Sequence, residues 1–230
     1  MKEIARPSRL NLTICALKRR GRSIGFVPTM GALHEGHRAL ILKSNKENDV
    51  TVVSIFVNPT QFGPREDFNR YPRPVGKDRK LLRKWKVDFL FRPEVRDLYP
   101  LESFRALIDV GDIGHVLCGE FRPGHFNGVA TVVAKLFNAV GPDHVYFGAK
   151  DYQQGVVIQN LIRDFQFPVT FHLVPTVRES DGLALSSRNI YLNPQQRRKA
   201  LVLPLTLRWV RDQIRHGRKD LARIKAEALK

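Results

Sequence analysis

The alternation of strand-like and helix-like segments between residues 24 and 174 limits the fold of this chain more than any other feature. Short apolar runs typical of buried strands occupy residues 23–27, 50–57, 87–91, 144–147 and 171–174. Segments with a helical apolar period lie between them, at residues 37–45, 78–85, 128–139 and 151–165. Such alternation builds βαβ units. We therefore expect an α/β fold with a Rossmann-like, doubly wound parallel sheet, which binds ligands beyond the carboxyl ends of its strands.

The sequence changes character near residue 175. Residues 194–215 form a strongly basic stretch with helical character, and residues 220–229 indicate one more helix. We therefore predict a first domain over residues 1–175 and a smaller second domain over residues 176–230. At the other end, Ile4, Leu10, Ile14 and Leu17 predict a short amphipathic helix that leads directly into the first strand.

The charge of the chain favours anionic partners. Its 230 residues include 39 Lys and Arg against 22 Asp and Glu, a formal net charge of +17. Phosphates, small carboxylates, nucleic acid or a membrane surface would all suit that charge. However, no RNA-binding signature is present, and the longest apolar run, residues 50–57, is too short to span a bilayer. Two cysteines, Cys15 and Cys118, with no secretory signal, predict a reducing cytoplasm.

The segment 28–37, PTMGALHEGH, follows a predicted strand and opens a predicted helix. His34 and His37 are three residues apart at the helix start, where backbone N–H groups and the helix dipole favour an anion. Gly36 lets a phosphate approach the backbone closely. One capping and one solvated histidine would also explain the pattern. Its position between strand and helix favours a nucleoside triphosphate site, in which the histidines stabilise charge as a phosphorus–oxygen bond breaks.

Two further segments at predicted strand ends carry groups suited to carboxylates and phosphates. Asn58 and Gln61 follow the second strand, and their amides suit a small hydroxy acid, although an ordinary turn explains them equally well. Lys150 follows a later strand, behind Gly148. A cation at a helix start opposes the helix dipole, so Lys150 is better explained as a point charge on phosphate than as a surface lysine. Asp151 can cap the following helix.

Two loops complete the set of candidate phosphate-binding segments. Ser186, Ser187 and Arg188 are suited to a mobile phosphate clamp, although a helix cap with a solvated arginine would explain these residues alone. Arg122 lies in a glycine-rich turn before the apolar helix, and its alternative is a plain left-handed turn. The agreement of several such clusters within one βαβ pattern favours a functional interpretation over chance.

Together these segments resemble the pantoate–β-alanine ligase family, part of the HxGH nucleotidyltransferase superfamily, from about Ile4 to about Leu192. The motifs are PTMGALHEGH at 28–37, FVNPTQFGPREDFNRYPR at 56–73, RPGHFNGVATVV at 122–133, FGAKDYQQ at 147–154 and LSSRN at 185–189. The resemblance implies a two-step ligation. Pantoate attacks ATP, assisted by Mg²⁺, to give pantoyl adenylate and pyrophosphate. The amine of β-alanine then attacks the acyl carbon to give pantothenate and AMP.

The resemblance also implies residue roles, and it supplies no metal ligands. His34, His37 and Lys150 are the expected catalytic residues, with His37 as the proton donor. Gln61 and Gln154 are expected to bind pantoate, Gln61 also to lie near β-alanine, and Arg122 to balance phosphate charge. The expected ATP-binding residues are Met30, Gly31, Ala32, Leu33, His34, Glu35, Gly36, His37, Gly148, Ala149, Lys150, Asp151, Val177, Leu185, Ser186, Ser187 and Arg188.

The expected partners are pantoate, β-alanine and ATP, without nucleic acid or membrane. The family implies a homodimer, with the apolar helix after Gly128 as an interface element. Leu185 replaces a methionine common in the family, and relatives continue for several tens of residues beyond Lys230, so a shortened C-terminal lid domain is expected. Two alternatives stay open: another HxGH adenylyltransferase acting on a phosphorylated acceptor, and a basic binding protein with a decayed enzyme core.

Overall fold

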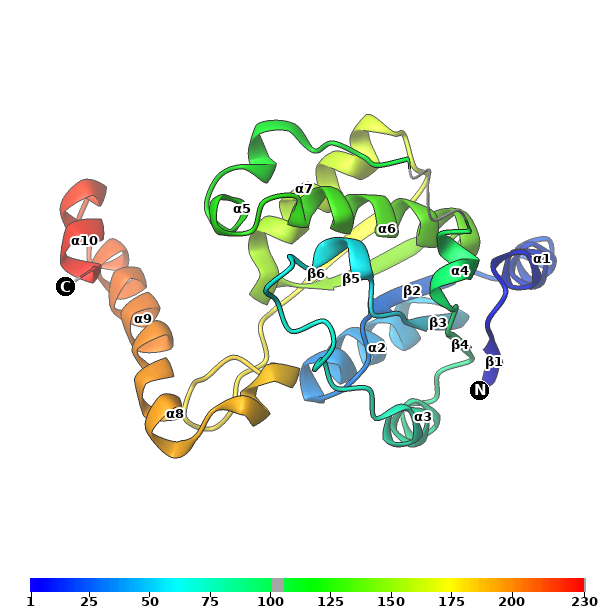
Figure 1. The fold of residues 1–230 in the computed structure, drawn as a ribbon, viewed down its shortest axis with the longest axis horizontal. Coiled ribbons are helices and arrows are strands. Elements are labelled where there is room, and N and C mark those ends of the chain that lie inside the picture. Colours follow the sequence, from blue (N-terminus) through cyan, green and yellow to red (C-terminus); the bar gives the residue numbers. More distant parts are fainter. Residues whose placement is uncertain (101–105, 230) are drawn as a thin grey trace. The chain divides into compact units, whose positions relative to one another are not determined.

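A computed structural model describes residues 1–100 and 106–229 of the chain (Figure 1). The chain divides into two compact units, Met1–Pro175 (unit 1) and Thr176–Lys230 (unit 2). The sheet and most of the buried apolar side chains belong to unit 1, whereas unit 2 consists of loops and helices. The assignment of residues 1–175 as a nucleotide- and pantoate-binding domain, and of residues 176–230 as a lid domain, stays a prediction.

Unit 1 is built on a six-stranded parallel sheet, which confirms the predicted α/β class. Across the sheet the strands are β1 (Lys2–Ile4), β4 (Phe89–Phe91), β3 (Val50–Ile55), β2 (Ile24–Thr29), β5 (His144–Gly148) and β6 (Thr170–Val174). From β2 the chain runs outward to β3 and β4, and later resumes on the other side of β2 with β5. The carboxyl ends of β2 and β5 therefore flank a topological switch point, where sheets of this class bind ligands.

Helices cover both faces of the sheet (Figure 1). On one face lie α1 (Pro7–Lys18), α6 (His125–Val140) and α7 (Tyr152–Asp164), and on the other lie α2 (Glu35–Glu47) and α3 (Val75–Lys84). Successive strand residues point to opposite faces: Phe26 and Val52 join the core of the first face, whereas Val27 and Val53 join that of the second. Burial on both faces explains why the central strands are almost wholly apolar.

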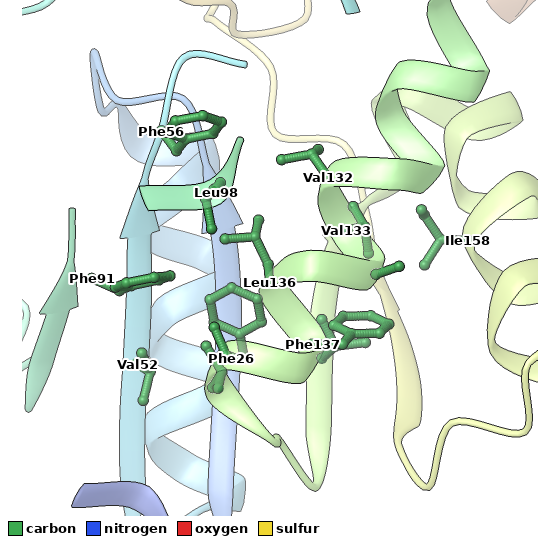
Figure 2. Packing of buried hydrophobic residues seen from close by; sticks show 14 of the residues in the cluster. Phe26, Val52, Phe56, Phe91, Leu98, Val132, Val133, Leu136, Phe137 and Ile158 are labelled. Carbon is green, nitrogen blue, oxygen red and sulfur yellow. The ribbon is translucent and has the colours of Figure 1, made fainter. Parts of the chain in front are cut away.

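The larger of the two cores lies between the sheet and α6 (Figure 2). Val132, Val133, Leu136 and Phe137 repeat at helical spacing along α6, and all four side chains are buried. Most of the remaining α6 residues are buried as well. The apolar side chains of this helix are therefore already packed inside unit 1, and α6 does not have the free apolar face that the expected dimer interface would need.

The N-terminal residues form a strand that the sequence analysis does not predict. β1 pairs in parallel with β4, from Lys2 opposite Phe89 to Ile4 opposite Phe91. Glu3 forms ion pairs with Arg79 and Arg92, at 2.7 and 2.8 Å. A three-residue strand has too few positions to show a period-two pattern, and its partner lies far along the chain. The pairing is therefore not visible in the local sequence.

β2 continues through Pro28, where the prediction ends the strand. The carbonyl of Thr29 accepts the N–H of Phe56 on the β3 side, so Pro28, one residue earlier, faces β5. β5 pairs with β2 only at Gly25 and Phe26. The ladder has thus ended before Pro28, and the missing N–H of the proline removes no hydrogen bond.

Short helical turns connect the main elements of unit 1. They are η1 (Pro59–Gln61), α4 (Val95–Leu98), η2 (Gly111–Gly114), α5 (Cys118–Phe121) and η3 (Ala149–Asp151). The predicted helix near residue 128 begins earlier, at His125, after Gly124 in a left-handed conformation. This earlier start matters for the site, because it brings the first turn of α6 against η1.

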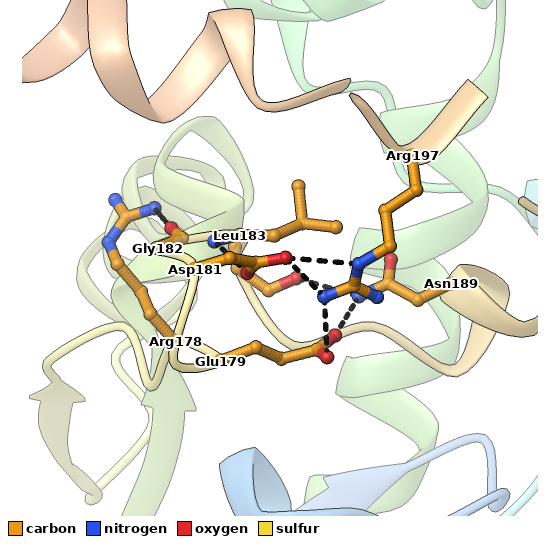
Figure 3. Close-up of polar contacts among 8 residues, drawn as sticks. Arg178, Glu179, Asp181, Gly182, Leu183, Asn189 and Arg197 are labelled. Atoms are coloured by element: carbon orange, nitrogen blue, oxygen red, sulfur yellow. Dashed lines mark hydrogen bonds and ion pairs between the residues drawn. The ribbon is translucent and has the colours of Figure 1, made fainter. Parts of the chain in front are cut away.

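Unit 2 combines a loop with η4 (Ser187–Tyr191), α8 (Pro194–Ala200), α9 (Val202–Arg215) and α10 (Leu221–Ala228). Figure 3 shows the polar network of the loop: the Arg197 guanidinium pairs with Glu179 and Asp181, both at 2.7 Å. Asn189 donates to the Glu179 carboxylate at 2.8 Å. The network ties α8 to the loop that carries residues 185–188. The predicted helix over 194–215 is divided into α8 and α9 at Leu201.

Candidate functional site

Two histidines form a capping box at the start of α2, beyond the end of β2. The Gly36 N–H donates to His34 Nδ1 at 3.1 Å, and the His34 N–H donates to His37 Nδ1 at 3.3 Å. The ring centroids lie 4.1 Å apart. Because each Nδ1 accepts a hydrogen bond, the proton of each neutral ring is on Nε2. The pair can therefore present two Nε2–H donors to a ligand.

His37 is a neutral group at neutral pH. Burial, followed by the nearby His34 and Lys150, lowers the pKa of His37 to about 3. The effect of Lys150 also shows that the structure brings the residue after β5 close to the residue after β2. Lys150 is exposed, and its Nζ lies 3.5 Å from Asp151 Oδ2. The fixed positive charge of this site is therefore on Lys150, and His37 can act as a hydrogen-bond donor.

Asp78 of α3 holds the loop that precedes the histidines, a role that is not among those predicted from the sequence. Its buried carboxylate accepts the N–H groups of Ala32 and Leu33, both at 2.9 Å. Gly31 and Ala32 have left-handed φ angles of 82° and 49°. Burial raises the pKa of Asp78, and the two backbone hydrogen bonds oppose that shift. An aspartate in the first turn of a helix is also ordinary helix chemistry, so no local signal distinguishes it.

The Gln61 side chain lies against the same loop. Gln61, in η1, donates from Nε2 to Met30 Sδ at 3.2 Å, and its Oε1 accepts from Asn58 Nδ2 at 3.2 Å. Asn58 is itself buried and bonds to the carbonyl of Gly128 at 3.1 Å. The predicted pantoate residue Gln61 and the predicted ATP residue Met30 are thus in direct contact.

Arg122 is paired within unit 1. Its guanidinium binds both carboxylate oxygens of Glu66, at 2.6 and 2.8 Å, which raises the pKa of Arg122. Its Nη1 lies 2.9 Å from His125 Nε2. The segment 60–66, which carries Glu66, and the segment 121–125, which carries Arg122, line a cavity of about 660 Å³. Gln61 is one of the residues that line it. The role predicted for Arg122, balancing phosphate charge, would require its pair with Glu66 to open.

Gln154 lies in the first turn of α7, after Gly148 and the η3 turn. Its neighbour Gln153 is engaged: the Gln153 amide binds the carbonyls of Ile113 and Val116, each at 2.8 Å. Among the described residues, the Gln154 amide has no hydrogen-bond partner. Of the two glutamines predicted to bind pantoate, Gln154 is therefore the one whose amide the described part of the fold does not use.

The remaining predicted ATP residues belong to unit 2. The Leu185 N–H donates to the Val177 carbonyl at 3.0 Å, and the Ser186 hydroxyl accepts the Arg188 N–H at 3.2 Å. Ser186 thus caps η4. A helix cap is the alternative to a phosphate clamp that the sequence leaves open for this segment. Unit 1 gathers His34, His37, Lys150, Met30 and Gln61, and unit 2 separately gathers Val177 with residues 185–188.

A parallel sheet with its switch point beside β2, an HxGH helix start after that strand and a lysine after β5 define an α/β protein of the HxGH nucleotide-binding class. The family model described as pantoate-beta-alanine ligase matches residues 2–230. The chain therefore belongs to the pantoate–β-alanine ligase family, which confirms the resemblance found in the sequence.

Curated relatives carry the name pantothenate synthetase. That of Sulfurihydrogenibium sp. (strain YO3AOP1) is 55% identical over 201 residues, 87% of this chain and 71% of the relative. That of Caldicellulosiruptor bescii is 50% identical over 225 residues, 98% of this chain and 76% of the relative.

Solved structures agree with the family assignment. The pantothenate synthetase of Thermus thermophilus is 49% identical with a TM-score of 0.91, covering 100% of this chain and 82% of that one. The pantoate-beta-alanine ligase of Francisella tularensis, complexed with beta-gamma ATP and beta-alanine, is 41% identical with a TM-score of 0.85, covering 90% and 79%. In the part of this chain that the structure describes, no helix is long and apolar enough to cross a membrane.

Proposed function

We propose that this chain joins pantoate to β-alanine at the expense of ATP, through a pantoyl adenylate, and releases AMP and pyrophosphate. The observation that carries the proposal is the arrangement of Lys150 beside the His34–His37 capping box, with Gln61 against the same loop. Membership of the family and the names of its relatives support this reaction.

In the first step, a pantoate carboxylate oxygen bonds to the α-phosphorus of ATP, and the bond from that phosphorus to the bridging oxygen breaks. Negative charge grows on the phosphates, so fixed cations and N–H donors lower the barrier. Lys150 supplies the charge, and His34 and His37 supply Nε2–H donors. Gln61 and Gln154 bind pantoate, because amides can both donate to its carboxylate and accept from its hydroxyls.

In the second step, the β-alanine nitrogen bonds to the acyl carbon, and the bond from this carbon to the AMP oxygen breaks. The β-alanine ammonium releases two of its three protons to solvent and keeps the third as the amide N–H, and AMP leaves as the phosphate anion. A strong base is not needed, because the adenylate is already an activated acyl group and proximity supplies most of the rate. Gln61, at the edge of the cavity of about 660 Å³, lies near the incoming amine. Val177 and residues 185–188 contact the nucleotide.

Mg²⁺ enters this proposal with the nucleotide. Among the described residues, no three His, Cys, Asp or Glu side chains are grouped so that they could hold a metal ion. The residues therefore do not fit a resident metal centre. Mg²⁺ is commonly held by substrate phosphates and water, with few protein ligands. A homodimer in the cytoplasm, where ATP is made, belongs to the same proposal, and light scattering of the purified chain tests the dimer.

The reaction is tested by incubating the purified chain with ATP, Mg²⁺, pantoate and β-alanine and measuring AMP. We expect AMP formation to require both pantoate and β-alanine, and exchange of pyrophosphate into ATP to require pantoate alone. Pyrophosphate release driven by a phosphorylated acceptor would instead identify another adenylyltransferase. Tight, steeply salt-dependent RNA binding without turnover would identify a basic binding protein.

A further inference from the structure

We propose that His125 is a positioning residue for pantoate, because it locks the η1 turn onto the start of α6 and so fixes the place of Gln61. The inference rests on the proposed function, in which Gln61 binds pantoate. His125 itself touches neither the capping box nor Lys150 by any described hydrogen bond. Its two ring nitrogens instead contact two segments that frame the cavity beside Gln61.

The two contacts of the ring determine its tautomer. Arg122 Nη1 lies 2.9 Å from His125 Nε2, and a guanidinium can only donate, so Nε2 accepts. The ring proton is therefore on Nδ1, which donates to the Gln61 carbonyl at 2.7 Å. Arg122 is fixed in turn by both oxygens of Glu66, in the loop that follows η1. The chain of contacts begins at Glu66, passes through Arg122 and His125, and ends at Gln61 in η1.

The environment of His125 keeps this tautomer neutral. The side chain is 9% exposed, and the ring packs edge-on against Phe126 with 4.9 Å between centroids. Burial and the Arg122 charge lower the pKa of His125, although the Gln61 carbonyl and Glu66 oppose this shift. A protonated ring would direct a second N–H at the Arg122 guanidinium, so the neutral form is the one compatible with both contacts.

The η1 turn lies in direct contact with the start of α6, so hydrogen bonds between the two segments can fix the position of the turn. A Cβ at Gly128 would overlap the Thr60 carbonyl and would lie 2.8 Å from the Gln61 nitrogen. Asn58 bridges the Gly128 carbonyl and Gln61 Oε1, at 3.1 and 3.2 Å. Backbone and side chain of Gln61 are thus both held from the α6 side. The Gln61 carbonyl accepts two hydrogen bonds, a short one from His125 Nδ1 at 2.7 Å and a longer one from Arg122 Nη2 at 3.4 Å.

Two substitutions of His125 separate the bond to Gln61 from the bond to Arg122. His125→Asn places an amide N–H near the position of Nδ1, so it keeps the donor to the Gln61 carbonyl and loses Arg122. His125→Gln places its amide near Nε2, so it keeps a partner for Arg122 and loses the donor to Gln61. His115→Gln is the control, because His115 is an exposed histidine of the same unit.

We expect the KM for pantoate to rise about 10-fold in His125→Gln, which corresponds to one hydrogen bond of about 1.4 kcal/mol. In His125→Asn and His115→Gln it should stay within about 2-fold of the wild type. The kcat and the KM for ATP should change little in all three. Amide hydrogen exchange of residues 59–66 should rise in His125→Gln alone, since only that variant removes the shorter of the two hydrogen bonds to the Gln61 carbonyl.

Equal effects of the Asn and Gln variants on the KM for pantoate would overturn the inference. So would a fall in the apparent kcat and in Tm with the KM for pantoate unchanged, which marks a role in stability alone. If the wild-type chain forms no AMP in response to pantoate, the proposed function fails. The exchange measurement would still decide whether His125 locks η1, because it does not depend on turnover.

Discussion

At the scale of single residues, charge and hydrogen bonding are divided between different side chains of the site. Lys150 carries a full positive charge, whereas the pKa of about 3 leaves His37 neutral. A neutral imidazole can still stabilise an oxyanion by donating Nε2–H, and it does not repel the neighbouring ammonium. The spacing of the two histidines at the helix start follows from capping, because each Nδ1 accepts a backbone N–H there. Each Nε2–H is left to face a ligand.

Removing the Lys150 charge should therefore lower the rate of adenylation more than it lowers the stability of the fold. We expect Lys150→Ala to lower the rate of pantoate-dependent pyrophosphate exchange by about 100-fold or more, as the loss of one charge-stabilising donor typically does. His37→Ala should have an effect of similar size. Lys46→Ala is the matched control, at the exposed far end of α2. Near-wild-type exchange in Lys150→Ala or His37→Ala would remove that residue from the mechanism.

The low pKa of His37 also predicts how the free energy of unfolding depends on pH. An unfolded histidine binds a proton near pH 6.5, and folded His37 does so only near pH 3. Between these values the unfolded chain binds more protons, so the free energy of unfolding falls as the pH falls, by at most about 1.4 kcal/mol per pH unit for this one group.

We expect His37→Gln to make that pH dependence shallower between pH 6.5 and the onset of acid unfolding. Denaturant titrations of wild type and variant at several pH values measure the difference. In the wild type, the NMR signal of the His37 ring should not shift between pH 5 and 8. A titration midpoint near pH 6.5 would contradict the neutral, half-buried ring.

Some site residues could be predicted from the sequence and others could not, for a physical reason. His34, His37, Lys150 and Gln61 each follow a strand, and the carboxyl ends of parallel strands meet at one edge of a sheet. Their convergence follows from the order of elements alone. Asp78 acts on a backbone 46 residues earlier, so its role depends on how α3 packs and leaves no local signal.

At the scale of elements, α3 and η1 both contact the loop of residues 30–33 that leads into the capping box. The loop places Ala32 in a left-handed conformation, which costs about 1 kcal/mol or more for a residue other than glycine. The Asp78 carboxylate offsets this cost by accepting two consecutive N–H groups. The backbone that leads into the capping box is thus held in a shape that it would not adopt alone.

Replacing Asp78 by asparagine tests this support. The amide keeps one acceptor and directs an N–H at the other backbone donor, which leaves a buried N–H without a partner. We expect Asp78→Asn to lower the free energy of unfolding by about 1–3 kcal/mol and to raise the KM for ATP about 10-fold. Lys80→Asn, exposed on the same helix, should change neither quantity. Wild-type stability and KM in Asp78→Asn would show that the loop holds its shape without this carboxylate.

The elements themselves differ in how well the sequence predicts them. The strands β2 and β3 are evident because burial on both faces makes every position apolar or small. β1 is not evident, since its pairing with β4 involves three residues. The break between α8 and α9 is also hidden, because Leu201 continues the helical apolar pattern and has helical φ and ψ angles. Pattern predicts burial well, and it predicts the partner of a short element poorly.

At the scale of the whole molecule, the buried apolar side chains are divided very unequally between the two units. In the part of unit 2 that the structure describes, only Leu183 and Ile224 are buried among the large apolar side chains. α9 and α10 line an apolar groove of about 400 Å³, where Leu203 and Leu207 are exposed. Unit 1 contains both hydrophobic cores. Most of the hydrophobic stabilisation therefore belongs to residues 1–175.

We accordingly expect a fragment of residues 1–175 to fold without unit 2. Its thermal unfolding, followed by circular dichroism, should be a single cooperative transition within about 5 °C of the main transition of the full chain, a difference of about 2 kcal/mol for a domain of this size. Because Gln61 and Gln154 both lie in unit 1, titration calorimetry should show pantoate binding to the fragment, whereas adenylation should be lost without residues 185–188. A fragment that binds a hydrophobic dye and unfolds without cooperativity would show that unit 2 supplies stability that its few buried side chains do not account for.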